Sequence, residues 1–460
     1  SQGYGTVGNA TVAGSIGVLG NSGSAGAIPL VARGGLVQTA NLQEWQNDAR
    51  SALSVVDKKG SFGIGTNTPS SPLHVKAATQ TVLLGQSDGT APCILQAEGY
   101  APLSTGGGGY VGRAARGSVA SPANVQVGDR LGYNVFGGYA DGFKHTAAIE
   151  ALVDSGTVSG SSLPSYLRFC TTPDSSTTRY ERLRISKDGY VGIGTANPQA
   201  LLHVSGTSPN VLMGDAANSI TSGVIGATIS GGGASGLTNR VTDDYGTVGG
   251  GENNQAGDNA GTTSDKSYAT VGGGLNNMAT GSVSIVGGGQ VNTASGLGST
   301  VGGGQINTAS GERSTVAGGY NNNASEMQAT IGGGFNNIAN GQAATVAGGH
   351  SNSAHMFSFV GGGQSNTISN ANSVIGGGYG NTISGIRCSI VGGDFNSVTG
   401  YYSTVGGGSN NAAAGDYSFV AGRRAKNSND AHDGVFLFAD QNDFNFNSLA
   451  ANEFAARCTG

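Results

Sequence analysis

The sequence predicts an all-β fold: an elongated fibre of three identical chains, with β-rich amino-terminal modules and a solenoid of about 15-residue coils. Three observations predict this fold. Glycine accounts for 85 of the 460 residues, charged residues make up only 11%, and a short motif recurs at nearly constant spacing. Ordinary soluble domains hold about 7% glycine and about 25% charged residues. Because glycine has no side chain to bury and loses much backbone freedom on ordering, backbone ladders and subunit association must stabilise this chain.

The repeated motif places an aliphatic anchor before a run of glycines, as in YATVGGG and GSTVGGG. Successive anchors are separated by 23 residues once and otherwise by 14 to 16 residues. We number positions from the anchor, which is position zero. Because side chains alternate along a strand, the anchor and the residue two positions before it should point inward, and the residue directly before it should point outward. Ile229 in ATISGGG has the pattern of a degenerate earlier copy. The predicted core anchors are Val248, Val271, Val286, Val301, Val316, Ile331, Val346, Val360, Ile375, Val391, Val405 and Val420.

Asparagine recurs six residues after the anchor, and alanine or isoleucine eight residues after it. A period of 15 suits a coil of two short strands and two turns. We expect the asparagines to be corner residues, since asparagine and glycine tolerate positive φ, and to form a hydrogen-bonded stack. The predicted ladder comprises Asn277, Asn292, Asn307, Asn322, Asn337, Asn352, Asn366 and Asn381.

A single coil of this composition encloses little besides Val, Ile and Ala. At about 25 cal/mol per Å² of apolar burial, against about 1 to 2 kcal/mol of backbone entropy per residue, one isolated column of coils is marginal. We therefore predict an obligate oligomer, most simply a homotrimer.

The repeat region, roughly residues 220–430, resembles the head domain of trimeric autotransporter adhesins. That resemblance implies a trimeric, left-handed parallel β-roll. The heads usually carry S-V-A-I-G at the anchor, which only the segment from Ser418 to Gly422 approaches here. The resemblance therefore extends to the fold and not to the matrix-protein binding of some members.

In the amino-terminal half, GSFGIGTNTPSSPLHV (60–75) and GYVGIGTANPQALLHV (189–204) align at a constant offset of 129. Each predicts a hairpin followed by a crossover that proline fixes. The pair resembles modules of phage tail fibres and related surface fibres. Residues 41–57 have apolar spacing compatible with a helix, but we favour two strands with a turn at Asn47 and Asp48. His74 and His203 occupy equivalent places, so we expect a structural role for them rather than metal binding.

We divide the chain into five parts. These are a glycine-rich attachment segment (1–40), a first β module (41–75), a second β-rich module (76–210), the β-roll repeats (211–433) and an aromatic β segment (434–460). In the tail-fibre family, segments similar to residues 434–460 precede an intramolecular chaperone domain, which assists trimerisation and is later removed.

Two surfaces are candidates for contact with a receptor. The 23-residue gap requires about eight extra residues, which must leave the stack as a loop and carry Asp258, Asp265 and Tyr268. Outward-facing aromatics form the second surface, for which packing between subunits is the alternative. Its tyrosine candidates are Tyr320, Tyr379, Tyr401 and Tyr402.

Other functions are disfavoured. The net charge is −5 without a dense basic tract, which argues against nucleic acid, and no run of 18 apolar residues predicts a membrane helix. We expect no metal, no cofactor and no catalytic residues. The pair Asp243 and Asp244, and the four aspartates between 430 and 443, are interpreted as solvated turn acids rather than an acid/base pair. We also expect Arg423, Arg424 and Lys426 to pair with Asp430 and Asp433, with contact to an anionic glycan as the alternative.

These resemblances imply a structural fibre, a phage tail or neck fibre that attaches to a glycan or protein of the host-cell surface. Its partners would be itself and, through residues 1–40, other virion proteins, which places it in the virion. The alternative is a bacterial trimeric adhesin or extracellular filament subunit at the cell surface. A polysaccharide depolymerase is the third and less favoured class.

Overall fold

The computed structural model describes residues 41, 43–46, 52–76, 113–118, 121–206 and 208–458. All regular secondary structure in these ranges is β, which confirms the all-β part of the predicted fold class. Among the described residues, no helix is long and apolar enough to cross a membrane. The chain divides into two compact units, residues 1–111 and 112–460. The predicted attachment segment and the turn at Asn47 lie outside the described residues.

The first unit contains a four-stranded sheet in the order β1-β2-β3-β4. Strands β1 and β2 pair antiparallel, as do β2 and β3, whereas β3 and β4 pair parallel. The prediction of two strands over residues 41–57 is therefore confirmed, and the helical alternative is wrong. The bounds are β1 Gln43–Gln46, β2 Ala52–Val56, β3 Phe62–Ile64 and β4 Leu73–Val75.

The second unit begins with a short hairpin of β5 and β6 and a six-stranded sheet in the order β12-β11-β10-β9-β8-β7. The antiparallel β10–β11 pair and the parallel β11–β12 pair repeat the arrangement of β2, β3 and β4. In both copies the Nδ1 atom of the histidine accepts the backbone N–H four residues upstream, at 3.2 Å for His74 and 3.4 Å for His203, which fits the expected structural role. The bounds are β5 Arg116–Ser118, β6 Ser121–Ala123, β7 Arg130–Tyr139, β8 Phe143–Val153, β9 Ser165–Thr171, β10 Tyr180–Ile185, β11 Val191–Ile193 and β12 Leu202–Val204.

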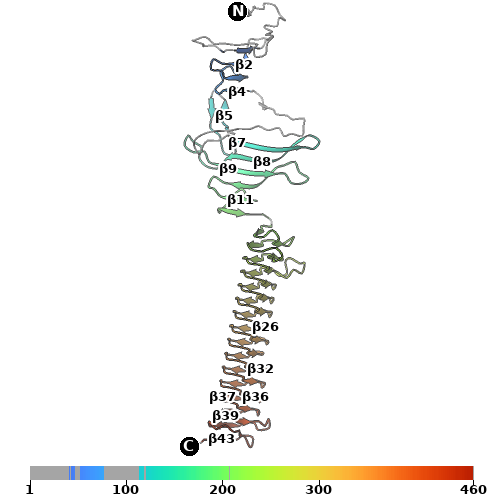
Figure 1. Cartoon of the computed structure of the whole chain (residues 1–460), viewed down its shortest axis with the longest axis vertical. Helices are drawn as coiled ribbons and strands as arrows, with labels where there is room; N and C mark the ends of the chain where they lie inside the picture. The colour runs from blue at the N-terminus through green and yellow to red at the C-terminus, as the bar shows by residue number, and fades with distance from the viewer. Residues whose placement is uncertain are drawn as a thin grey trace, which may run out of the picture. The chain divides into compact units, whose positions relative to one another are not determined.

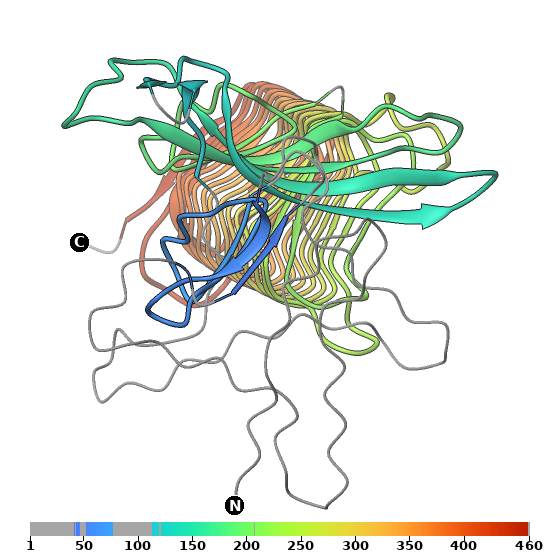
Figure 2. The same cartoon turned by 90° about the horizontal axis from the view of Figure 1, so that it is seen from above.

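The remaining chain winds into a parallel β-solenoid whose coils stack one above another (Figure 1). Viewed from above, the coils nearly superpose with a gradual rotation (Figure 2). The 16-stranded sheet contains β13 Val211–Met213, β15 Thr228–Ser230, β17 Thr247–Val248, β19 Thr270–Val271, β21 Ile285–Val286, β23 Thr300–Val301, β25 Thr315–Val316, β27 Thr330–Ile331, β29 Thr345–Val346, β31 Phe359–Val360, β33 Val374–Ile375, β35 Ser389–Ile390, β37 Thr404–Ser409, β39 Phe419–Arg423, β41 Phe436–Ala439 and β43 Phe454–Arg457.

The opposite, 15-stranded sheet receives the second strand of each coil. It contains β14 Ser219–Ile220, β16 Arg240–Val241, β18 Gln255–Ala256, β20 Met278–Ala279, β22 Thr293–Ala294, β24 Thr308–Ala309, β26 Asn323–Ala324, β28 Ile338–Ala339, β30 Ser353–Ala354, β32 Thr367–Ile368, β34 Thr382–Ile383, β36 Ser397–Val398, β38 Ala412–Ala413, β40 Ala425–Asn427 and β42 Phe446–Asn447. Because β41, β42 and β43 join these same two sheets, the aromatic segment after residue 433 continues the stack.

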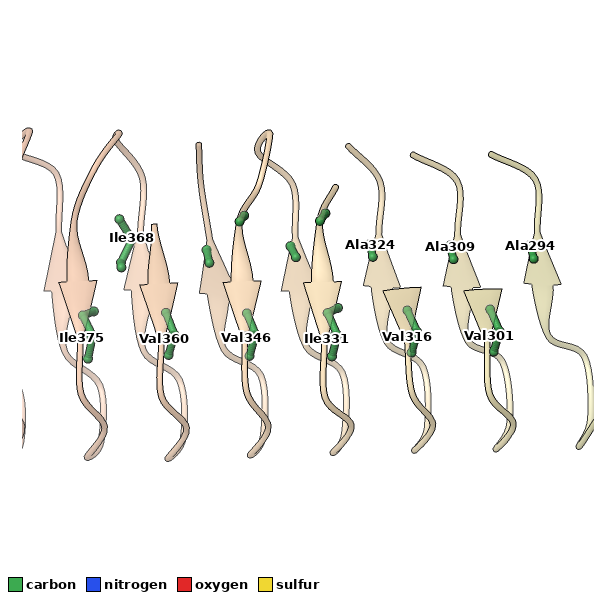
Figure 3. Packing of buried hydrophobic residues seen from close by; sticks show 14 of the residues in the cluster. Ala294, Val301, Ala309, Val316, Ala324, Ile331, Val346, Val360, Ile368 and Ile375 are labelled. Carbon is green, nitrogen blue, oxygen red and sulfur yellow. The ribbon is translucent and has the colours of Figure 1, made fainter. Parts of the chain in front are cut away.

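The core lies between the two sheets and is narrow. Anchors such as Val301 and Val316 from one sheet face alanines such as Ala309 and Ala324 from the other, and all are fully buried (Figure 3). Val271 pairs with Val286 and Val286 with Val301, so the anchors lie in register from coil to coil. Ile229 is also buried and pairs with Val248, which confirms it as an earlier copy.

One predicted anchor is wrong. Val391 is 63% exposed, whereas its neighbour Ile390 is buried and pairs with Ile375 on one side and Val405 on the other. The segment CSIVGG offers two adjacent aliphatic residues, and only the register set by the neighbouring coils selects the inward one. The corrected spacing is 15 residues on both sides, so this coil has the ordinary length.

The asparagine ladder is confirmed as a hydrogen-bonded stack, but its residues are not the corners. The backbone N–H of Asn292 donates to Oδ1 of Asn277 at 3.0 Å. Its side-chain amide donates to the carbonyls of Gly288 at 2.9 Å and Gly304 at 2.8 Å. The ladder asparagines are buried, and the preceding residue adopts positive φ instead, for example Asn276 at 56°. The side chain is thus turned inward, where it replaces lost backbone hydrogen bonds.

Candidate functional site

The extra residues between the anchors Val248 and Val271 form a loop that projects from the stack between β18 and β19, near the amino-terminal end of the solenoid (Figure 1). The backbone N–H of Tyr268 donates to the carbonyl of Asp244 at 2.9 Å, and that of Asp244 donates to the carbonyl of Thr263 at 2.7 Å. The ring of Tyr268 stacks on that of Tyr245, with centroids 4.8 Å apart. These contacts attach the loop to the turn of the preceding coil.

Two predicted contact residues of this loop meet a third acid from the adjacent turn. Asp243, Asp258 and Asp265 each place one carboxylate oxygen within 4.8 Å of the others. Sequence reasoning paired Asp243 with Asp244, but the Oδ1 atom of Asp244 instead accepts the backbone N–H of Ile225 at 3.0 Å. The expectation that Asp243 is a solvated turn acid is wrong, because its side chain is 1% exposed.

The Asp243 carboxylate is incompletely satisfied. Its Oδ2 atom accepts the hydroxyl of Thr242 at 2.9 Å and the backbone N–H of Asp258 at 3.0 Å, whereas Oδ1 is buried without a hydrogen-bond partner. Burial raises the pKa of the Asp243 carboxyl above its ordinary value, and those two hydrogen bonds oppose the shift. Gly257 passes directly over this carboxylate at a φ of 99°, where a Cβ would collide with Oδ2.

Exposed side chains on the solenoid align in columns, because equivalent residues of successive coils lie side by side. One column holds the residue four positions after each anchor, linked from coil to coil by parallel bridges. In it, the ring of Phe335 stacks between Tyr320, at 5.1 Å, and His350, at 4.9 Å. Further along the same column, Tyr379 meets the edge of Phe395 at 4.9 Å.

A second column holds the residue three positions before each anchor, a corner of positive φ. Here Tyr402 stacks on Tyr417 at 5.2 Å, and the Arg387 guanidinium lies over the Tyr402 ring at 5.3 Å and donates to its hydroxyl. Tyr401 is also exposed, but its backbone N–H is held by the Asp416 carboxylate at 2.7 Å. The predicted tyrosines therefore belong to separate clusters, and sequence reasoning gave His350 and Arg387 no part in them.

An open groove of about 540 Å³ lies at the carboxy-terminal coils. Its lining includes Asp394, Ser409, Arg423, Phe438, Asp440 and Gln441. The predicted partners of Arg423 and Arg424 are wrong: both pair with Asp443, at 3.0 and 2.5 Å. These pairs depend on how the last turns fold back, which the local sequence does not specify.

No protein-family model matches the sequence, and no curated protein sequence matches it. Among solved structures, the chain is similar to the carboxy-terminal domain of the bacteriophage T5 L-shaped tail fibre. The identity is 14%, the TM-score is 0.17, and the match covers 32% of this chain and 61% of that structure. The function is therefore argued from the geometry of this chain.

Proposed function

We propose that the chain is a structural fibre and adhesion protein without catalytic activity, a phage tail or neck fibre that attaches to a host-cell surface. The observation that carries the proposal is the solenoid itself, in which each coil hydrogen-bonds to the next through its backbone and its buried asparagine. Such a stack contacts only neighbouring coils and extends without a large core. A stiff column of this kind is suited to holding a surface away from its attachment point.

The exposed columns supply the contact surface of the proposal. Stacked rings such as Tyr320 and Phe335, and Tyr402 and Tyr417, present amphipathic faces at about the 4.8 Å spacing of parallel strands. Aromatic rings bury apolar area, and the hydroxyl of tyrosine can also form a hydrogen bond, a combination that fits a glycan or a protein at the cell surface. The loop residues Asp258, Asp265 and Tyr268 form the second part of this surface.

Homotrimer formation is part of the same proposal. The outer face of the 16-stranded sheet carries exposed apolar side chains at the position before the anchor, among them Ile285, Phe359 and Val374. A row of β-branched and aromatic residues suits packing against another copy of the same sheet. Sedimentation equilibrium should give about three times the chain mass of 45.3 kDa, and a monomer would refute the assembly.

Adsorption of the labelled full chain to a panel of bacterial strains tests the attachment role. We expect saturable binding to a subset of strains and competition by their extracted surface polysaccharide. The double variant Tyr402→Ala and Tyr417→Ala should bind more weakly, whereas Tyr133→Ala, which removes an exposed tyrosine of the six-stranded sheet, should bind normally. Failure to bind any strain, or equal binding by all variants, would contradict the proposal.

The bacterial adhesin or filament subunit remains the alternative, since the same solenoid serves either assembly. Immunogold labelling of purified particles and of producing cells separates the two. Label on virions favours the tail or neck fibre, and label on the envelope of uninfected cells favours the adhesin.

A further inference from the structure

The three carboxylates of the insertion loop carry an inference that does not depend on the proposed function. Asp243 follows strand β16, whereas Asp258 and Asp265 lie 15 and 22 residues later, on the loop before β19. The fold nevertheless gathers one oxygen of each within 4.8 Å. Three charged carboxylates at this separation repel one another strongly, and a cation among them removes that repulsion.

The nearby basic side chain does not neutralise the cluster. Lys266 reaches only Asp265, with Nζ 3.7 Å from Oδ2, and both side chains are substantially exposed. Exposed pairs of this kind contribute little. The other contacts of the cluster are neutral hydrogen-bond donors: the hydroxyl of Thr242 and the backbone N–H of Asp258 donate to Oδ2 of Asp243, and the backbone N–H of Ala260 donates to Oδ1 of Asp258.

The unpartnered Oδ1 of Asp243 is a second, separate observation. This residue is 1% exposed, so water does not replace the missing partner freely. Buried polar atoms almost always have a partner, and an exception requires a bound ion, a water or a specific role. An oxygen with free lone pairs, in a carboxylate that already belongs to a three-acid cluster, is a suitable cation ligand.

We propose that Asp243, Asp258 and Asp265 form a Ca²⁺ site that attaches the insertion loop to the solenoid. All three side chains offer oxygen, which calcium prefers, and none offers the nitrogen or sulfur typical of zinc sites. Calcium accepts irregular sets of oxygen ligands, whereas magnesium requires near-octahedral geometry and retains water. An irregular loop that approaches a fixed turn is more easily matched to calcium.

The ion would hold the loop at the point where it leaves the stack. Asp258 lies directly after Gly257, whose backbone already crosses the Asp243 carboxylate, and Asp265 lies three residues before the stacked Tyr268. Binding would therefore order both ends of the loop and fix the position of the exposed Tyr268 ring. Loss of the ion would release the loop without unwinding the coils, since their ladders do not include it.

Calcium titration of the full chain after chelation tests the site. We expect isothermal titration calorimetry to give one Ca²⁺ per chain, with a dissociation constant of about 1 mM or lower, as in extracellular calcium sites. Terbium, with emission sensitised by tyrosine, serves as a second probe that added calcium should displace. Hydrogen exchange in residues 258–268 should slow on calcium addition.

Three variants make the test specific. Asp265→Asn should weaken binding at least about tenfold, which is about 1.4 kcal/mol, and Asp243→Asn should abolish it. The control Asp394→Asn removes an exposed carboxylate from a distant coil and should leave binding unchanged. Because Asp265 is exposed, its variant remains decisive even if Asp243→Asn misfolds.

Several results would overturn the proposal. These are no calcium binding by the wild-type chain, unchanged affinity in Asp265→Asn, or weakening by Asp394→Asn equal to that by Asp265→Asn. Magnesium titrated alone must bind more weakly than calcium, and equal affinities would refute the assignment of the ion.

Discussion

Replacement of Asn337 by alanine tests whether the buried ladder holds the coils together. The side-chain amide donates to the carbonyls of Gly333 and Gly349, both at 2.9 Å, and Oδ1 accepts the backbone N–H of Asn352 at 3.0 Å. Asn337→Ala removes all three bonds and leaves their backbone partners in a largely buried place. The Gly349 carbonyl still accepts the backbone N–H of Phe335 at 2.9 Å, so two groups lose their partner. An unsatisfied buried group costs about 1 to 3 kcal/mol, so the two give at least about 2 kcal/mol.

Hydrogen exchange of the full chain measures this loss locally, because solenoids open by neighbouring coils. A decrease of about 2 kcal/mol in the free energy of opening corresponds to about thirtyfold faster exchange. We expect that change at the amide of Asn352 and in the adjacent coils, with little change in distant coils.

The matched control is the preceding residue. Asn336 adopts a φ of 55° at the corner, and its amide donates only to the hydroxyl of Ser351 at 3.2 Å. The Oδ1 atom of Asn336 also accepts the side-chain amide of Asn321 at 2.9 Å. Asn336→Gly preserves the backbone conformation and removes these two bonds, whose groups water can reach, so it should cost less than about 1 kcal/mol. If Asn337→Ala accelerates exchange no more than Asn336→Gly does, the ladder is not what stabilises the stack.

Three further predictions concern register, corner strain and charge. Ile390→Asp should disrupt folding of the neighbouring coils, because Ile390 is buried. Val391→Asp should leave the circular dichroism and the melting temperature unchanged, because Val391 is exposed. The opposite result would show that Val391 is the buried anchor. Ile306→Gly should stabilise by up to about 1 kcal/mol in thermal unfolding, since a β-branched residue is held there at a φ of 60°, and a lower melting temperature would contradict the strain argument. The Arg116 guanidinium lowers the pKa of Asp129 to about 2, so NMR titration should show Asp129 charged well below pH 3.8 in the wild type, and its pKa should rise in Arg116→Gln. The stabilisation from that pair is complete above the ordinary pKa of the carboxyl and is lost as pH falls through about 2; an unchanged Asp129 pKa in the variant would refute the assignment.

The sequence by itself determined the features that repeat along the chain. The 15-residue period predicted the solenoid, the Val and Ile anchors such as Val286 and Val301, and the stack of asparagines, because each coil presents the same local pattern to its neighbours. The single long gap predicted the loop between β18 and β19 for the same reason. Periodicity is a property of the sequence, and stacking converts it directly into contacts.

Only the tertiary structure decided how the turns place their side chains. Val391 and Ile390 are equally apolar, and cross-coil register alone distinguishes the inward residue. Asp243 joins Asp258 and Asp265, rather than Asp244, because the loop folds back onto the turn of the preceding coil. The ladder asparagines are buried because the residue before each takes the left-handed conformation. Turn direction depends on contacts between segments far apart in sequence, which no local pattern contains.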